Sequence, residues 1–279
     1  MKELLKMEKI WYSYEEHFVA LKDVSVTTHE EERIAILGNN GAGKSTFFLC
    51  CNGVLQPQSG SIYLKGRPIT RSKQDATLLR QAVGLVFQEP DNQIIAGTVE
   101  NEVSFGPINL RLPSEEVEVR IAESLTRMNL DGYQKRAPQY LSGGEKKRVS
   151  IADILAMKPD MILLDEPTAS LDPENVELLE RTLEELSRTG ITLVVSTHDV
   201  DFAYRFATRA IVFSRGEVIA DADIDEVFAS EDILTRAGLT KPLLYAAAQL
   251  IEAQFPEAAA DKKPKSIAQF KEYLAGIKR

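Results

Sequence analysis

The chain has 279 residues, of which 44% are hydrophobic and 27% charged, and its formal net charge is −9. This composition is ordinary for a globular protein, and the acidic balance argues against a nucleic-acid partner. No apolar run reaches the roughly 18 residues of a membrane span, and the first residues lack the apolar core of a signal peptide. We therefore expect any membrane association to be peripheral, on the cytoplasmic side.

The cysteines and histidines exclude a disulfide framework and a resident metal cluster. Cys50 and Cys51 are adjacent, which fits a reducing compartment, and we interpret both as apolar core residues on a helix. The three histidines, His17, His29 and His198, are scattered along the chain and form no ligand cluster. If this protein serves a metal ion, the sequence predicts that the chain itself does not hold it.

Apolar runs alternate with helical patterns along most of the chain. Strands are predicted at 24–28, 33–37, 60–66, 82–87, 161–165, 191–196 and 209–214, and helices at 44–53, 142–157, 173–188 and 199–207. This alternation predicts an α/β fold with a mainly parallel sheet and right-handed crossovers. The strand at 60–66 is expected in an antiparallel edge sheet. The charged, proline-punctuated stretch from 89 to 140 is interpreted as a helical insertion.

A phosphate-binding loop follows the strand at 33–37. Its residues are Gly38, Asn39, Asn40, Gly41, Ala42, Gly43, Lys44 and Ser45, which match G-x-x-x-x-G-K-[ST] between a strand and a helix. The glycines let successive backbone N–H groups point at phosphates, and the helix dipole adds to their field. Lys44 is expected to reach the β- and γ-phosphates, and the Ser45 hydroxyl to bind Mg²⁺. We include Thr46 in this site; a ligand-free turn would not require Lys-Ser.

Two carboxylates follow the apolar strand at 161–165. Asp165 and Glu166 emerge at its carboxyl end, where α/β sheets place ligands. We expect Asp165 to belong to the Mg²⁺ shell and Glu166 to orient and deprotonate an attacking water. Two adjacent acids alone would more often form a solvated loop, but a phosphate loop in the same chain favours a catalytic role.

Aromatic residues near the start could hold the base of a nucleotide. The chain lacks the N-K-x-D element that reads guanine, and Trp11, Tyr12 and Tyr14 precede the first core strand. One of them could stack on an adenine ring, and we prefer Tyr14. The alternative is an aromatic residue that lies on a strand face.

The ordered set of motifs resembles the ATPase subunits of ABC transporters over roughly residues 8–220. The set consists of the phosphate loop, Gln88 after a buried strand, the run Leu141-Ser142-Gly143-Gly144-Glu145, the Asp165-Glu166 pair, Ser170-Leu171-Asp172, and His198. The resemblance implies a P-loop NTPase fold with an N-terminal antiparallel β subdomain, an inserted helical subdomain at about 89–157 and a C-terminal helical tail. The ATPase domain would span 1–222 and the tail 223–279.

The resemblance also implies a role for each motif. Gln88 is similar to the Q-loop glutamine, which contacts Mg²⁺ and the water, and His198 to the switch histidine at the γ-phosphate. Asp172 resembles the D-loop aspartate that links two active sites. The run from 141 to 145 resembles the signature motif, which closes on ATP held by the other subunit of a head-to-tail dimer. The sequence departs from the commoner pattern at Asn39, where proline is more usual, and at Glu145, where glutamine is.

Within this family the chain is most similar to the energy-coupling factor (ECF) group, through residues 86–113 and the signature region. The similarity to its CbiO-like subunits favours cobalt as the cargo, then nickel, with a vitamin as the alternative. It implies a second ATPase subunit, identical or paralogous, a transmembrane coupling protein that docks around residues 88–92, and a substrate-binding membrane component.

Two alternative functions are less favoured by the sequence. The first is a soluble ABC ATPase outside transport, which the single ATPase unit and the acidic charge disfavour. The second is a nucleotide-gated scaffold without turnover, which Glu166 and His198 disfavour.

Overall fold

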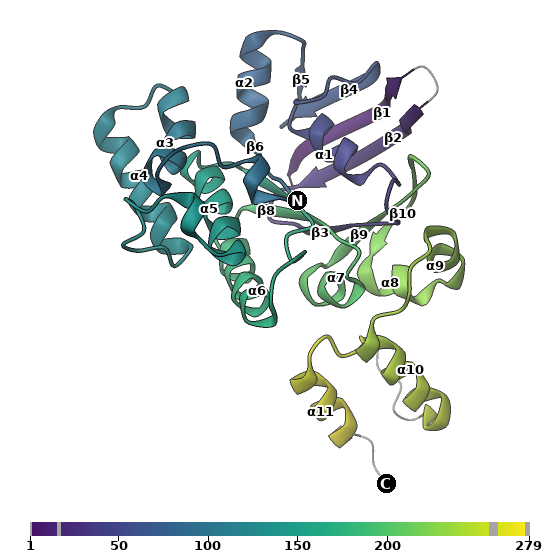
Figure 1. Ribbon diagram of the computed structural model, residues 1–279. Helices are drawn as coiled ribbons and strands as arrows, with labels where there is room; N and C mark the ends of the chain where they lie inside the picture. Colours follow the sequence, from purple (N-terminus) through teal and green to yellow (C-terminus); the bar gives the residue numbers. More distant parts are fainter. Residues whose placement is uncertain (1, 16–17, 257–261, 277–279) are drawn as a thin grey trace.

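The structure is a computed structural model that describes residues 2–15, 18–256 and 262–276. It contains a four-stranded antiparallel sheet, a six-stranded mixed sheet and helices packed around them (Figure 1). The small sheet has the order β2-β1-β4-β5, and its strands are β1 Glu3–Glu15, β2 Phe18–His29, β4 Ser59–Leu64 and β5 Arg67–Ile69. The expected α/β P-loop fold with an antiparallel β subdomain is confirmed.

The large sheet positions the site. Its order is β10-β9-β3-β8-β7-β6, and its strands are β3 Arg33–Leu37, β6 Val83–Val86, β7 Met161–Asp165, β8 Thr192–Ser196, β9 Arg209–Ser214 and β10 Glu217–Asp223. Every neighbouring pair is parallel except β9 and β10. The carboxyl ends of β3, β8 and β7 therefore meet at one edge, where a doubly wound sheet presents its ligand site.

Helices cover the sheets and form a group at one side of the molecule. The helices of the ATPase region are α1 Lys44–Cys51, α2 Lys73–Ala82, α3 Val99–Asn109, α4 Ser114–Arg127, α5 Gly143–Ala156, α6 Pro173–Ser187 and α7 Val200–Phe206. Figure 1 shows α3, α4 and α5 together, away from the four-stranded sheet. The predicted limits of this helical subdomain, 89–157, and of the ATPase domain at 222 stay predictions.

Strand β3 shows how one run of residues serves two hydrophobic cores. Successive side chains of a strand point to opposite faces. Ile34 and Ile36 pack with β1, β2 and α1 in the core between the two sheets. Ala35 and Leu37 pack with α5, α6 and α7 in the core on the other face. Burial on both faces explains why this strand reads as a continuous apolar run.

The C-terminal segment continues as α8 Ile224–Ala229, α9 Glu231–Ala237, α10 Leu243–Gln254 and α11 Ile267–Gly276. It is attached to the ATPase region through the buried Tyr204 of α7. The Tyr204 hydroxyl lies 2.5 Å from Asp225 Oδ1 and 3.2 Å from the Lys263 carbonyl, and the Lys265 ammonium lies over the Tyr204 ring. Burial and the carboxylate of Asp225 raise the pKa of this phenol, so it stays a donor. The polar run at 255–266 predicts a linker before the last helix, and residues 257–261 of it lie outside the described residues.

The structure contains elements that the sequence analysis did not predict. These are β1, β5, α2 and β10, and β2 begins six residues before its predicted start at residue 24. Strand β1 carries polar residues in both orientations and shifts register against β2 several times. These irregularities interrupt the period-two pattern by which a strand is recognised.

We predict that Tyr204→Phe lowers the free energy of unfolding by about 1–2 kcal/mol, because the half-buried carboxylate of Asp225 loses its donor. Urea denaturation followed by circular dichroism measures the change. Tyr140→Phe is the matched control, since Tyr140 is 83% exposed and surface substitutions usually stay within about 0.5 kcal/mol. Equal stabilities of the two variants would contradict the attachment of the tail through Tyr204.

Candidate active site

The phosphate loop joins β3 to α1, and two of its glycines are required by its geometry. Gly38 has φ +138°, and a Cβ there would lie 2.2 Å from the Phe213 carbonyl oxygen. Gly43 has φ +107°, and a Cβ would lie 2.6 Å from the Ala20 carbonyl oxygen. These positions combine a backbone conformation unfavourable to other residues with a close approach of neighbouring backbone. The loop is therefore shaped by both sheets of the protein.

Lys44 begins α1 and is held by the loop that it follows. Its ammonium donates to the carbonyl of Gly38 at 2.7 Å and to that of Asn39 at 3.3 Å. Burial lowers the pKa of Lys44, and the nearby carboxylates of Glu166 and Asp165 oppose this effect. The side chain thus folds back over the loop, which places its charge where an anion bound by the loop would lie.

The two carboxylates at the end of β7 have different partners. Asp165 accepts a hydrogen bond from the Ser196 hydroxyl at the end of β8. Glu166 has φ +42°, an uncommon conformation for a residue with a side chain, and its N–H donates to the Ser196 carbonyl at 3.0 Å. Strand β8 thereby fixes both residues and turns their side chains in different directions.

Glu166 and His198 lie in direct contact. The Glu166 Oε2 atom is 2.8 Å from His198 Nδ1 and accepts a hydrogen bond from the His198 backbone N–H at 3.3 Å. Glu166 is buried, whereas the His198 side chain is 68% exposed. A buried carboxylate oriented by an exposed imidazole is a suitable arrangement for a general base and its orienting partner.

A cavity of about 180 Å³ unites these elements. Its lining consists of Phe18, Ala20, Asn40, Gly41, Ala42, Gly43, Lys44, Ser45, Thr46, Gln88, Asp165 and Glu166. Most predicted phosphate-loop residues, the predicted glutamine and both carboxylates thus share one space. The sequence analysis did not identify Phe18, although an aromatic residue on a polar strand end close to Tyr14 was a possible signal.

Tyr14 lies beside the phosphate loop. It is half exposed, and its hydroxyl is 3.2 Å from the Thr46 hydroxyl. Its ring is 5.0 Å from that of Tyr12 and 6.3 Å from that of Phe18, measured between centroids. The position is compatible with base stacking, and Tyr14 as the stacking residue stays a prediction.

The signature residues lie at the start of α5 and do not line the cavity of their own chain. Ser142 caps the helix by accepting from the Glu145 N–H at 3.3 Å, and Glu145 accepts from the Ser142 N–H at 2.7 Å. Tyr133 also donates to Glu145, at 2.7 Å. The chain thus uses Glu145 in a capping box. Two glycines in the first turn, Gly143 and Gly144, leave backbone N–H groups open to an anion.

Asp172 begins α6 and is connected to the signature helix α5. It accepts from the Asn175 backbone N–H at 3.0 Å and from its side-chain amide at 2.7 Å, and these bonds lower the pKa of Asp172. The Asn175 amide oxygen in turn accepts from Arg148 of α5 at 3.0 Å. A Cβ at Gly144 would lie 2.2 Å from that oxygen. Asp172 and the predicted signature motif are therefore joined by one asparagine.

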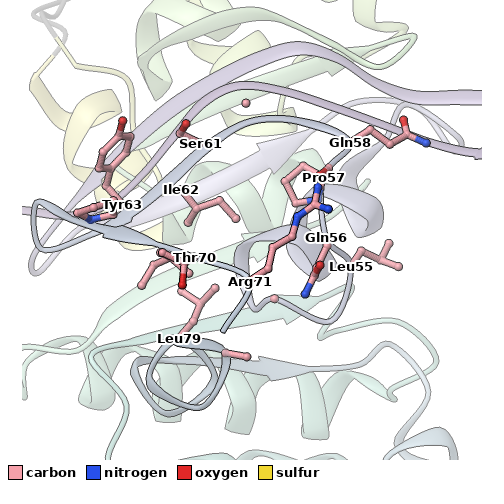
Figure 2. A pocket seen from close by; sticks show the side chains of 15 residues that line it. Leu55, Gln56, Pro57, Gln58, Ser61, Ile62, Tyr63, Thr70, Arg71 and Leu79 are labelled. Atoms are coloured by element: carbon pink, nitrogen blue, oxygen red, sulfur yellow. Dashed lines mark hydrogen bonds between the residues drawn. The ribbon is translucent and has the colours of Figure 1, made fainter. Parts of the chain in front are cut away.

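A second cavity, of about 190 Å³, lies among α2, β4, β5 and the loop after α1. Figure 2 shows Arg71 and Pro57 near its centre, with Gln56, Thr70 and Leu79 around them. Its lining includes neither a carboxylate nor a phosphate-loop residue. This cavity lacks the groups that phosphoryl transfer requires, so we assign no part of the chemistry to it.

The donor set of the first cavity suits Mg²⁺ and no tightly held transition metal. Ser45, Gln88 and Asp165 offer oxygen atoms, which Mg²⁺ prefers, and it commonly completes its shell with phosphates and water. Within the described residues, no group of three or more histidine, cysteine or acidic side chains could hold a metal ion. Nor is any helix there both long and apolar enough to cross a membrane.

Comparisons with known proteins identify the family. Residues 21–169 match the family described as ABC transporter. The energy-coupling factor transporter ATP-binding protein EcfA of Methanothermobacter thermautotrophicus is 47% identical over 239 residues, 86% of this chain and 77% of that protein. EcfA of Methanococcus maripaludis is 43% identical over 249 residues, 89% of this chain and 88% of the relative.

Solved structures agree. The structure of cbiO1 from Clostridium perfringens, described as part of the ABC transporter complex cbiONQ, matches with a TM-score of 0.76 and 36% identity and covers 92% of this chain and 97% of its own. A dimeric ATP-binding cassette in a post-hydrolysis state bound to ADP and Pi matches with a TM-score of 0.71 and 31% identity, over 79% of this chain and 99% of its own. The chain therefore belongs to the ABC transporter family, as an ATP-hydrolysing subunit of the energy-coupling factor type.

Proposed function

We propose that ATP binds in the cavity at the end of β3 and β7 and is hydrolysed there with Glu166 as general base. The observation that carries this proposal is the shared lining of that cavity, in which residues 40–46, Gln88 and both carboxylates meet. The loop N–H groups and Lys44 bind the phosphates, and Tyr14 stacks on the base. Ser45, Gln88 and Asp165 would hold Mg²⁺, and the ion would supply positive charge to the phosphates.

Glu166 orients the attacking water and accepts its proton. The contact with His198 fixes the carboxylate, and the exposed side of the imidazole is free to reach the γ-phosphate. Gln88 lines the same cavity and would contact the water and the metal. Efficient attack by water also requires hydrogen-bond donors for the rest of the negative charge on the γ-phosphate, and one chain does not supply all of them.

A second subunit supplies the missing part. The signature residues lie outside their own chain's cavity, and the capping box does not use the N–H groups of Gly143 and Gly144, so these two groups are available to ATP in another chain. The full run is Leu141, Ser142, Gly143, Gly144 and Glu145. Two subunits arranged head to tail hold two ATPs at their interface, and Asp172 links the two sites. The partner is a second copy or a paralogue. ATP closes this dimer, and hydrolysis opens it.

The dimer powers uptake through a membrane complex, with cobalt as the favoured cargo and nickel next. This choice over a vitamin rests on the resemblance of residues 86–113 and of the signature region to CbiO-like subunits. The subunit attaches to the cytoplasmic face of a prokaryotic cell membrane through a transmembrane coupling protein that docks around residues 88–92, and a substrate-binding membrane component selects the cargo. The exposed apolar residues Ile95, Phe105 and Ile108, near that segment and on α3, suit a membrane-protein partner.

Replacing Glu166 by glutamine should lower kcat by about 10²–10⁴ while ATP binding persists, because the amide keeps the side chain's shape and cannot accept the proton. The variant should accumulate as an ATP-bound dimer. Phosphate release measures turnover, and gel filtration with ATP and Mg²⁺ measures dimerisation. Turnover close to that of the unmodified protein would show that Glu166 is not the general base.

Ser142→Arg should abolish hydrolysis by placing a large cation between the two subunits. Binding of a fluorescent ATP analogue to the single subunit should change by less than about threefold, because Ser142 does not line its own cavity. Loss of this binding would instead place the signature motif in the pocket of its own chain. A circular dichroism spectrum matching that of the unmodified protein controls for folding.

Co-purification tests the transporter and its cargo. The tagged chain is expressed in its native cell, and the membranes are solubilised in mild detergent. We expect small integral membrane proteins in fixed ratio with two ATPase chains, and radiolabelled cobalt uptake that depends on this chain. If vitamin uptake depended on this chain and cobalt uptake did not, the cargo would be a vitamin instead of cobalt. Recovery of the chain without any membrane protein would contradict the proposed transport function.

A further inference from the structure

Lys147 is a buried cation on the signature helix α5. It lies five residues after Ser142, and only 1% of its surface is exposed. Its ammonium donates to the backbone carbonyl of Phe87 at 3.0 Å and to that of Gln88 at 2.6 Å. A residue of the helix that carries the signature motif thus holds the backbone of the proposed catalytic glutamine.

This arrangement is costly for a residue that only fills space. Moving an ammonium group out of water costs several kcal/mol unless it is well compensated. Burial lowers the pKa of Lys147, and the charges of Glu89 and Asp165 oppose this effect. Among the described residues, no carboxylate lies within ion-pair distance of Lys147, and its hydrogen-bond acceptors are carbonyl groups. A methionine would fill the same volume without that cost. The charge at Lys147 therefore serves to hold the position of the two carbonyls.

Gln93 provides a second, independent connection between the same two elements. Its side-chain oxygen accepts from the Phe87 N–H at 3.2 Å, and its side-chain amide donates to the Ser150 carbonyl of α5 at 3.0 Å. The Q-loop segment, defined as residues 87–93, is therefore attached to α5 through the less exposed residues Lys147 and Ser150, one helical turn apart, in addition to the more exposed Lys146–Asp91 ion pair.

We propose that Lys147 is a positioning residue that couples the Q-loop segment to the signature helix, so that the placement of Gln88 at one ATP fixes the signature motif presented to the other ATP. The proposal rests on the proposed ATP-driven dimer. In this dimer, Gln88 takes a fixed position when ATP and Mg²⁺ bind. The backbone carbonyls of Phe87 and Gln88 then fix the position of the Lys147 ammonium. The first turn of α5 is fixed with it, because it belongs to the same rigid helix.

The test is ATP-dependent dimerisation in the Glu166→Gln background, in which closed dimers accumulate. Adding Lys147→Met removes both hydrogen bonds and keeps the apolar stem. We expect at least about tenfold weaker dimerisation at saturating ATP, measured by analytical ultracentrifugation. Binding of a fluorescent ATP analogue to the single subunit should change by less than about threefold. The melting temperature should change by only a few degrees, because the loss of two hydrogen bonds and the removal of a buried charge have opposite effects on stability.

Lys146→Met in the same background is the matched control. Lys146 is the preceding residue of α5 and pairs with Asp91 at 2.6 Å, but the Asp91 side chain is 73% exposed. Because a surface ion pair contributes little, dimerisation should change by less than about threefold. If Lys147→Met does not fold, Lys147→Gln, which keeps a shorter donor, is measured with the same expected direction.

The possible failures are distinguishable. If the Glu166→Gln protein does not dimerise with ATP, the proposed function fails first. If it dimerises and Lys147→Met dimerises equally well, the coupling role is overturned while the proposed function stands. If Lys147→Met loses ATP binding and thermal stability together with dimerisation, Lys147 has a merely structural role and the proposal is also overturned.

Discussion

The structure depends on one constraint, the parallel pairing of β3, β8 and β7, which brings three carboxyl ends to one edge of the sheet. From these ends come the phosphate loop, the residues around Ser196, and the two carboxylates. Local preferences could not bring these segments together, because the phosphate loop at 38–45 is distant in sequence from Asp165 and Glu166, and a complete helix, α6, separates those carboxylates from Ser196. The register of the strands sets the distance between Glu166 and Ser196, and Ser196 in turn orients Asp165. Burial of both sheet faces makes this edge rigid.

A second level of organisation connects the helical region to that edge. The Q-loop segment follows β6 and is held by Lys147 and Gln93, so it belongs to the sheet at one end and to α5 along its length. At its far side, the buried Glu102 of α3 accepts from the N–H groups of Ile95 and Ala96 at 2.9 and 2.7 Å. Helices α3 and α5 are therefore attached to the segment that lines the candidate active-site cavity through polar contacts, which have defined geometry, in addition to apolar packing.

The sequence predicted the parts of the fold and site that depend on strong local patterns. The strands at 33–37, 161–165 and 209–214 match the structure because a strand buried on both faces is a short apolar run with clear ends. The phosphate loop was recognisable because its chemistry requires a fixed spacing. Helix α2 was not predicted because most of its residues are polar, so its single buried face gives a weak apolar pattern in the sequence. Phe18 and Lys147 could not be assigned from sequence, since only tertiary packing decides that an aromatic residue reaches the cavity and that a lysine is buried.

The contact between Gly144 and Asn175 has a consequence for recombination between relatives. The asparagine occupies the space of a missing side chain on α5, and it also completes the cap of α6 through Asp172. Residues 144 and 175 therefore form a complementary pair across two segments that are distant in sequence. A chimera that exchanged the helical insertion alone would separate this pair and place a foreign helix start against a native cap. Exchange should preserve function only when the crossover lies beyond residue 175, so that both members come from the same parent.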